Sequence, residues 1–331
     1  MSQPFAAFYR GKRVLVTGHT GFTGGWLVAW LKLLGARVCG YSLPPSSRPN
    51  FFDATLLDRG MTSVFADVRA RDTLANTLAD FQPEIIFHAA QTASSCDPVD
   101  LYSTNVMGTI NLLEEARLTG CARAMIFVGD SQVSNSLTRA SHFAAEQGCF
   151  AFAESFFRES RTGVAVVHLP TLIGGGDWGQ SGLVPALLRC LISGEPIEIR
   201  DAIVHRAHVL EAARLCLQLC ENLYASGPAG SSSCDFVPAD NEVILESEFA
   251  KKFLTAWGGE DVQIELLKPD SAAPFRSVNN KRECPIWTAA LSLDEAIDWT
   301  VHWYKAYSTD PSSAWRTTEA QIEQYAKLPI R

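Results

Sequence analysis

The fold is decided by residues 14–24, which read Val-Leu-Val-Thr-Gly-His-Thr-Gly-Phe-Thr-Gly. A β-rich run ends in three glycines spaced three residues apart, and a helix-period segment follows. Glycines at such a turn let backbone N–H groups approach a pyrophosphate, whose charge the helix N-terminus also favours. They could merely close the turn, but their place at the first strand-to-helix connection argues for a ligand. The residues predicted to contact a dinucleotide here are Gly18, Thr20, Gly21, Phe22, Thr23 and Gly24.

The first half of the chain alternates short apolar runs with amphipathic segments, as βαβ units around a parallel sheet do. After Pro170 the alternation stops, so a second lobe is expected to begin there. A Gly-, Ser- and Ala-rich stretch at 225–233 reads as a loop, and helical periodicity returns at 293–307. The predicted fold is α/β: a Rossmann-type doubly wound parallel sheet over residues 1–170, with a smaller C-terminal α/β substrate lobe over residues 171–331, the chain being free to cross between them. Strands are predicted at 13–17, 37–41, 63–66, 84–88, 124–128 and 164–169, and helices at 26–34, 73–80, 105–118 and 139–157.

The composition bounds the class of protein. The 331 residues are 47% hydrophobic and 19% charged, which allows a large core and excludes a disordered or fibrous chain. A net charge of −8 argues against a nucleic-acid partner, because such binding needs a positive face. Nine scattered cysteines without CxxC pairs predict reduced thiols and no metal site, and the Cys216/Cys220 pair reads as core. With no signal peptide or membrane span evident, a cytoplasmic location without a membrane partner is expected.

The end of the second strand bears on the choice between NAD and NADP. Tyr41 and Ser42 stand where an acidic residue would hold the ribose diol of NAD. Arg48 offers a charge to a 2′-phosphate, or is a solvated loop residue. Ser42 is therefore expected to contact the adenosine half, and the residues leave both cofactors open.

The glycine spacing resembles that of the extended short-chain dehydrogenase/reductases, and longer stretches are similar to the CDP-glucose 4,6-dehydratases among them. The resemblance implies NAD or NADP as cofactor, with NAD favoured, and a nucleotide-sugar as substrate, with a CDP-sugar favoured. It implies lyase-type chemistry in carbohydrate biosynthesis. The stretches that carry it are 11–43, His88-Ala89-Ala90-Gln91, Asn105-Val106-Met107-Gly108-Thr109, Ile173-Gly174-Gly175-Gly176-Asp177-Trp178, and Asp298-Trp299-Thr300 with Trp303-Tyr304.

The resemblance also implies further cofactor contacts at the C-terminal ends of strands, where such folds bind ligands. Each has an ordinary structural alternative, such as an aspartate that caps a turn or alanines that are small for packing reasons. The implied contacts are Asp67, Val68, Ala89, Ala90, Gln91 and Asn105.

The resemblance breaks at the catalytic pair. The superfamily uses Tyr-x-x-x-Lys on the helix after the fifth strand, where residues four apart share a face and the lysine lowers the tyrosine pKa. Here Thr138 and His142 occupy those positions, and no tyrosine lies between Tyr102 and Tyr224. Only Asp130 survives from the family's Thr-Ser-Asp-Lys run. The usual oxidation of the sugar is therefore expected to be crippled.

The sequence departs from the family pattern at two further positions, both expected on the substrate side of the site. His168 stands where the family often has arginine, and an arginine-rich segment is shortened to residues 200–209. Arg200, Arg206 and His208 could meet a diphosphate or be surface residues.

Three hypotheses follow. In the first, a rewired enzyme uses His142 as general base and Asp130 as general acid, although His142 could merely face the cofactor ribose and Asp130 merely cap a turn. Thr138 cannot replace a phenolate, because an alkyl hydroxyl is far less acidic. In the second, the chain is a binding subunit, a pseudoenzyme that acts in regulation or assembly. In the third, Tyr102 or Tyr224 supplies the missing phenol.

A homodimer is expected by resemblance, through segments 105–118 and 139–157. The second segment is more apolar than one buried face readily uses. It contains Phe143, Phe150, Phe152, Phe156 and Phe157.

Overall fold

The computed structural model describes residues 5–92, 97–130, 137–179, 182–236, 243–259, 262–267 and 289–329. A seven-stranded parallel sheet dominates it, in the order β10-β6-β5-β4-β1-β2-β3. All six strands predicted from the sequence are present within two residues. Their bounds are β1 Arg13–Thr17, β2 Arg37–Ser42, β3 Thr62–Phe65, β4 Ile85–His88, β5 Ala124–Asp130 and β6 Gly163–Leu169.

The seventh strand, β10 (Ser232–Asp235), corrects the loop expected at 225–233. It pairs with β6 in parallel register, Asp235 opposite His168. Ser-Ser-Cys-Asp has little strand propensity of its own, so this strand depends on tertiary pairing. The chain therefore leaves the large sheet after β6 and returns to it at β10.

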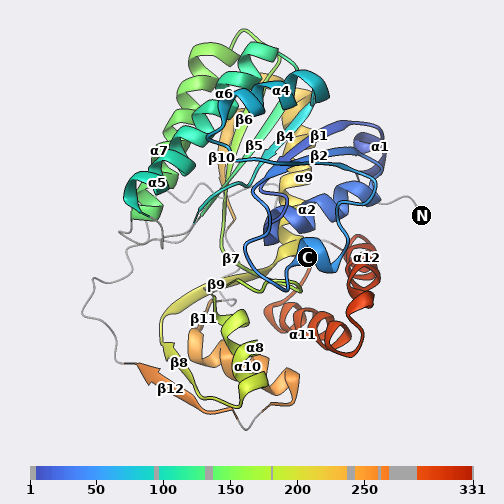
Figure 1. The fold of residues 1–331 in the computed structure, drawn as a ribbon, viewed down its shortest axis with the longest axis vertical. Coiled ribbons are helices and arrows are strands. Elements are labelled where there is room, and N and C mark those ends of the chain that lie inside the picture. The colour runs from blue at the N-terminus through green and yellow to red at the C-terminus, as the bar shows by residue number, and fades with distance from the viewer. Residues whose placement is uncertain are drawn as a thin grey trace.

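Helices cover both faces of the sheet (Figure 1). α2 (Phe22–Leu33) and α9 (Val209–Ser226) cover one face, and α4 (Arg71–Phe81), α6 (Gly108–Thr119) and α7 (Leu137–Phe152) cover the other. Successive strand residues alternate between the two layers. In β1, Val14 and Val16 join the core under α2 and α9, whereas Leu15 joins the core under α4 and α6.

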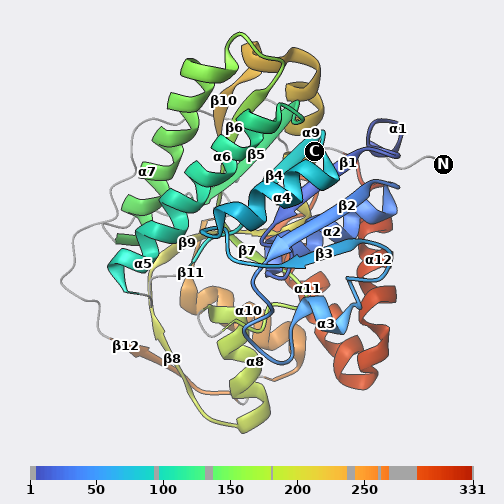
Figure 2. The same ribbon diagram turned by 45° about the horizontal axis from the view of Figure 1, so that its top comes forward.

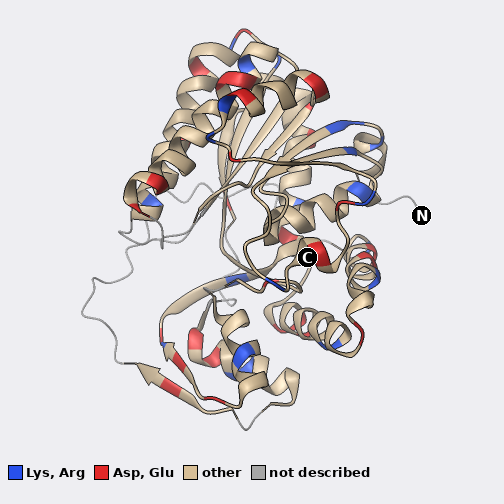
Figure 3. Cartoon of the chain, viewed as in Figure 1, with Lys and Arg blue, Asp and Glu red and all other residues tan. Residues whose placement is uncertain are grey.

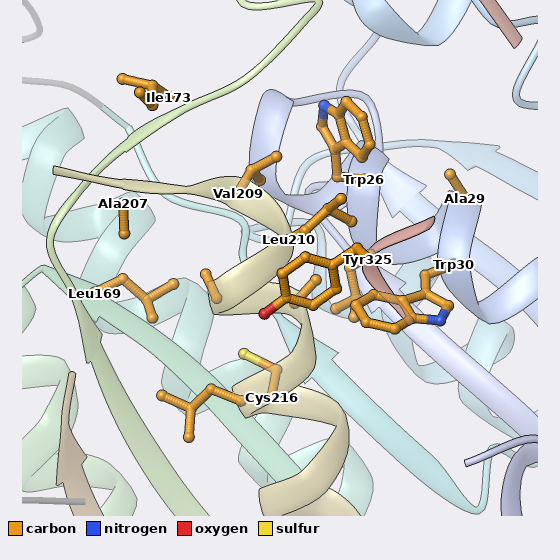
Figure 4. Packing of buried hydrophobic residues seen from close by; sticks show 14 of the residues in the cluster. Trp26, Ala29, Trp30, Leu169, Ile173, Ala207, Val209, Leu210, Cys216 and Tyr325 are labelled. Carbon is orange, nitrogen blue, oxygen red and sulfur yellow. The ribbon is translucent and has the colours of Figure 1, made fainter. Parts of the chain in front are cut away.

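The core under α2 and α9 extends into the C-terminal helices. Figure 4 shows Tyr325 of α12 beside Trp30 of α2 and Leu210 and Cys216 of α9. The Tyr325 and Trp30 rings meet edge to face at 5.6 Å. Cys216 and Cys220 are buried in this core, as predicted.

A smaller lobe lies below the large sheet in Figure 1, and the turned view in Figure 2 shows the same separation. It contains a three-stranded sheet, β11-β9-β7, and a two-stranded sheet, β12-β8. Its elements are β7 Thr171–Ile173, α8 Leu183–Ser193, β8 Ile197–Arg200, β9 Ile203–His208, β11 Val243–Leu245, α10 Glu246–Trp257 and β12 Ile264–Leu267, and α11 Leu293–Thr309 and α12 Ala314–Tyr325 follow. The short elements are α1 Ala6–Tyr9, α3 Phe51–Ala54, α5 Pro98–Tyr102, the π-helical segments η1 Ser103–Met107 and η2 Ala153–Phe157, and the 3-10 helices η3 Gly227–Gly230 and η5 Pro311–Ser313.

Surface charge and cysteine chemistry agree with the composition, with one correction. Acidic and basic residues are interspersed along the ribbon in Figure 3. Six described cysteines are free thiols. Cys234 is disulfide-bonded, so the expectation of nine reduced cysteines is wrong for it. Spacing along the chain does not reveal a bond between distant cysteines.

Candidate functional site: a dinucleotide turn and an altered helix

The glycine turn lies where the strand order of the large sheet reverses. β1 pairs with β2 on one side and with β4 on the other, and doubly wound sheets bind ligands beyond their strands' carboxyl ends at such a point. Gly18 follows β1 with φ +75°, a conformation that favours glycine. A Cβ there would lie 2.6 Å from the carbonyl oxygen of Ala89, which follows β4. The two connections approach so closely that only glycine fits.

The helix that follows presents a free N-terminus. The N-cap of α2 is Gly21, and no side chain caps the helix. A Cβ on Gly24 would lie 2.2 Å from the carbonyl oxygen of Gly18, so the first turn packs directly on the glycine loop, residues 18–24. Phe22 and Thr23 begin this turn. Backbone N–H groups at an uncapped helix start favour an anion, and this cradle fits the pyrophosphate of a dinucleotide.

His19 points inward and fastens the loop to the sheet. Its side chain is fully buried, and Nε2 lies 2.6 Å from Ser63 Oγ in β3. A Cβ on Gly40 would lie 2.3 Å from the imidazole ring, so β2 also carries a glycine where the ring passes. Burial lowers the pKa of His19 to about 4, so the ring is neutral at pH 7.

The end of β2 lies beside the loop, where the adenosine half was expected. Thr20 donates a hydrogen bond to the carbonyl of Leu43, and its Oγ1 lies 2.9 Å from Ser42 Oγ. Arg48 is exposed on the following segment. No acidic residue follows β2 before Asp53, as the sequence indicated.

Beyond β3, Asp67 and Val68 have different surroundings. Asp67 pairs with Arg69 at 2.7 Å, and these hydrogen bonds lower the pKa of Asp67. The Tyr41 hydroxyl donates to the Asp67 carbonyl at 2.9 Å, which ties β2 to this turn. Val68 is buried, and a Cβ on Gly108 would lie 2.6 Å from Val68 Cγ2. Its side chain packs in the core, as the ordinary structural alternative to a cofactor contact predicts.

The segment after β4 is tied to both neighbouring strands. Ala89 N–H donates to the Thr17 carbonyl of β1, and Ala90 N–H donates to Thr17 Oγ1. The Gln91 amide donates to the carbonyl of Val128 in β5. These three predicted cofactor residues therefore lie together at the carboxyl ends of β1, β4 and β5.

A buried histidine network beneath this segment was missed by the sequence analysis. His88 Nδ1 lies 2.7 Å from Thr17 Oγ1, and Nε2 lies 3.0 Å from Thr109 Oγ1. Thr109 in turn donates to the Asn105 carbonyl at 2.7 Å. Burial lowers the pKa of His88 to about 4. A histidine inside an otherwise apolar strand, Ile-Ile-Phe-His, was the available signal.

Asn105 connects the segment after β4 to α7. Its Oδ1 accepts from Thr92 N–H at 3.0 Å, and its Nδ2 donates to Ser141 Oγ at 2.9 Å. The side chain is buried. The structure therefore brings this predicted cofactor residue next to the altered helix.

The altered catalytic positions lie on the first turns of α7. Thr138 Oγ1 is buried and has no hydrogen-bond partner within the described chain, whereas its carbonyl accepts from Ser141 at 2.6 Å. His142 lies one turn later and is half-buried. Asp130 is the last residue of β5, opposite Leu169 in register, and its side chain lies outside the described residues.

The three predicted diphosphate contacts are placed differently from one another. Arg200 is exposed at the end of β8. Arg206 is buried, pairs with Glu246 at 2.5 Å and stacks over Phe249 at 4.4 Å. The interpretation as surface residues is therefore wrong for Arg206, and also for His208.

His208 is fully buried at the start of α9. Its Nδ1 accepts from Leu210 N–H at 3.3 Å, and its ring lies between Trp26 and Trp299 at 5.9 Å from each. Burial lowers the pKa of His208 to about 3. A neutral ring that caps a helix inside the core has no charge to offer a diphosphate.

The placement of Tyr224 argues against its acting as the missing phenol. Its hydroxyl lies 3.3 Å from Glu84, and Glu84 N–H donates to the Arg13 carbonyl at the amino end of β1. The glycine loop lies at the opposite end of that strand, about 15 Å away at 3.3 Å per residue.

Comparison with known proteins identifies the family. The model of the NAD dependent epimerase/dehydratase family matches residues 14–231. The chain belongs to this family. A CDP-glucose 4,6-dehydratase from Salmonella typhimurium is 32% identical, over 91% of this chain and 92% of that protein.

Solved structures of the family share the fold. The UDP-glucose 4-epimerase of Thermotoga maritima with UDP-glucose has a TM-score of 0.73 at 19% identity, covering 89% of this chain and 99% of that one. The UDP-glucose 4-epimerase of Thermus thermophilus, in complex with NAD, has a TM-score of 0.71 at 20% identity, covering 88% and 99%. The Rossmann-type α/β fold predicted from the sequence is confirmed.

The described residues lack two further features. They hold no group of three or more His, Cys, Asp or Glu side chains arranged for a metal ion. None of their helices is long and apolar enough to cross a membrane.

Proposed function

We propose that this member of the family binds NAD, in preference to NADP, together with a nucleotide-sugar, and that it acts on the sugar through a rewired active site. One contrast carries the proposal. In the glycine loop, a Cβ on Gly18 or Gly24 would lie within 2.6 Å of a backbone carbonyl oxygen, whereas α7 carries Thr138 and His142 in place of tyrosine and lysine.

The cofactor would be held by groups that the fold already orders. The loop glycines and the start of α2 would receive the pyrophosphate. Ser42 would meet the adenosine, and Ala89, Ala90 and Gln91 would flank the nicotinamide half. When bound, the dinucleotide supplies a hydride acceptor at its nicotinamide ring.

The protein side of the chemistry would fall to His142 and Asp130. Histidine titrates close to neutral pH, so His142 can take a proton from a sugar hydroxyl, and Asp130 can return one. Thr138 would hold a hydroxyl by hydrogen bonding, because it is too weak an acid to work as a phenolate does.

A CDP-sugar is the proposed substrate class. The support is the CDP-glucose 4,6-dehydratase that is 32% identical over nearly the whole chain. Arg200, at the exposed end of β8, is the best placed of the three predicted diphosphate contacts, because Arg206 and His208 are both buried.

The alternative is a pseudoenzyme that binds these ligands without turnover and serves regulation or assembly. One observation favours it. Thr138 Oγ1 is buried without a partner in the described structure, so this hydroxyl is not aligned with an acceptor that would activate it.

One experiment separates the two. Mass spectrometry of nucleotide released from the purified protein is followed by incubation with CDP-, UDP-, GDP- and dTDP-sugars. Turnover that is lost in Asp130→Asn or His142→Ala supports the rewired enzyme. The matched control is His302→Ala, an exposed histidine on α11. Bound dinucleotide with every sugar unchanged supports the pseudoenzyme.

A homodimer through η1, α6, α7 and η2 is proposed for the assembly. Phe143 is 60% exposed and Phe156 is 51% exposed, as are Met107 and Leu118 at 50% and 57%. Phe157 is buried and does not contribute. Light scattering at micromolar concentration tests the dimer, and Phe143→Glu should give a monomeric mass.

The proposed dinucleotide-binding domain comprises residues 1–170, and the proposed substrate lobe comprises residues 171–331. Within the second span, α9 and β10 return to the large sheet.

A further inference from the structure

A histidine and two carboxylates join three elements next to the altered helix. His168, on β6, has Nδ1 2.6 Å from Asp235 Oδ1 on β10 and Nε2 3.1 Å from Glu146 Oε2 on α7. The three side chains are 19%, 27% and 14% exposed, in the order named. Both ring nitrogens face carboxylate oxygens, which accept but do not donate when ionised. The geometry is therefore satisfied only when both nitrogens carry protons.

This cluster fastens α7 at a second point. Ser141 of α7 already accepts from Asn105, which in turn holds Thr92 beyond β4. Glu146 lies five residues after Ser141 and binds His168. The turn of α7 that contains His142 therefore lies between two fastenings, one to η1 and one to the sheet.

The charges that act on His168 come from two neighbouring elements. Burial opposes its charge, but the hydrogen bonds with Asp235 and Glu146 outweigh burial and raise the pKa of His168 to about 9. From β5 the residue opposite is Gly129, which has no side chain. The nearby thiol of Cys149 on α7 has its pKa raised by burial and by Glu146, so this thiol stays neutral where His168 titrates.

We propose that His168 is a positioning residue: its imidazolium, held by Glu146 and Asp235, pins the His142 turn of α7 against the sheet, and loss of its proton to water in alkaline solution releases that turn. The neutral ring donates one hydrogen bond instead of two, so one carboxylate is left facing a lone pair. The freed contact is the one to Glu146, because the Asp235 contact is shorter and lies within the paired strands β6 and β10. What His142 then does rests on the proposed function, whereas the pinning does not.

Hydrogen exchange of α7 tests the pinning on the full chain without ligand. Amide exchange across Leu137–Phe152 is measured in steps of about half a pH unit from pH 7.5 to 10 and corrected for the intrinsic rate at each pH. In the wild type, the protection of α7 is expected to fall about 10-fold more than that of α10, the control helix in the small lobe. His168→Arg keeps its charge and should remove this difference, and Asp235→Asn should move the midpoint about one pH unit lower. An equal fall in wild type and His168→Arg, with an unmoved midpoint in Asp235→Asn, would overturn the proposal.

Titration with NADH from pH 7 to 10 adds a separate readout. The wild type is expected to lose about 10-fold in affinity across pH 9, and His168→Arg about 2-fold or less. If α7 loses protection while the NADH affinity stays constant, His168 positions the helix alone. The proposed effect of this pinning on dinucleotide binding is then overturned. Absence of NADH binding at pH 7 overturns the proposed function, and the exchange experiment still decides the pinning.

Discussion

The glycine loop follows β1 and α7 follows β5 of the same sheet, with β4 between these two strands, and the histidines of the two regions are held in opposite ways. His19 and His88, beneath the loop, are buried among hydroxyls and apolar rings, and their pKa values are lowered to about 4. His168, beneath α7, faces two carboxylates, and its pKa is raised to about 9. The histidine contacts of the loop are thus made by neutral rings, whose protonation does not change near pH 7. The α7 helix is instead fastened by a charged histidine between two carboxylates. The same division separates the region that keeps the family pattern from the region that has lost it.

The largest expected effect comes from breaking the loop side. Gly18→Ala should raise the Kd for NADH at least about 1000-fold, because the new Cβ would lie 2.6 Å from the Ala89 carbonyl at φ +75°. Fluorescence titration measures the Kd. Gly60→Ala is the matched control, since Gly60 has φ +76° and open space around it. Equal binding by both variants would show that the close approach of Gly18 to Ala89 is not required for binding the dinucleotide.

The second prediction sharpens the contrast in pH dependence. His88 has a folded pKa of about 4 against 6.5 when unfolded, so its contribution to stability is fully present above pH 6.5 and is lost as pH falls toward 4. Urea unfolding should show the wild type losing about 3 kcal/mol more than His88→Gln between pH 7 and 4. His302→Gln, at an exposed histidine, should track the wild type. Parallel profiles for wild type and His88→Gln would contradict the neutral, buried ring.

The third prediction separates chemistry from binding. His142→Ala should slow conversion of the active nucleotide-sugar about 100-fold, the usual effect of removing a general base. The Kd for NADH should stay within about 3-fold, because the glycine loop and the His168 contacts that fasten α7 are both untouched. A large rise in Kd with little change in turnover would make His142 a ribose contact and not a base.

The smallest effect is expected at the link between β2 and the turn after β3. Tyr41→Phe removes the hydroxyl that donates to the Asp67 carbonyl at 2.9 Å, which should cost about 1 kcal/mol in the free energy of unfolding. Ser47→Ala, in an exposed turn, serves as the control. An unchanged free energy of unfolding in Tyr41→Phe would mean that water replaces the lost donor.

The fold was largely predictable because its central strands are buried on both faces and read as runs of Val, Ile and Phe. The helix after the loop was predicted to start at Trp26, but α2 starts at Phe22. Gly24 and Gly25 lower helix propensity there, and they are required by the close approach of the loop and of Phe51. Local propensity and tertiary packing disagree at this point, and packing prevails.

The positions of the candidate site residues were predictable where they depend on backbone spacing and unpredictable where they depend on pairing between distant residues. Gly18 and Ala89 directly follow β1 and β4, at the strand ends where such folds bind ligands, and Asn105 lies on the next long helical segment as expected. The partnership of His168 with Asp235 spans 67 residues and needs β10, a strand with no pattern of its own. Arg206 and His208 were considered as possible contacts for a diphosphate. Arg206 is instead paired with a residue of α10, and His208 is packed against residues of α2 and α11.

The late arrival of β10 has a consequence during synthesis. Until Ser232–Asp235 leaves the ribosome, β6 has a row of backbone N–H and C=O groups on its outer side with no strand to pair. Roughly 60 residues of the small lobe and α9 are made in that interval, which at about 5–20 residues per second takes roughly 3–12 seconds. A nascent chain paused there carries an open sheet edge, and so would an isolated fragment ending at residue 170. An open edge of this kind is a template for pairing with another chain, so expression of the truncated domain should yield aggregates.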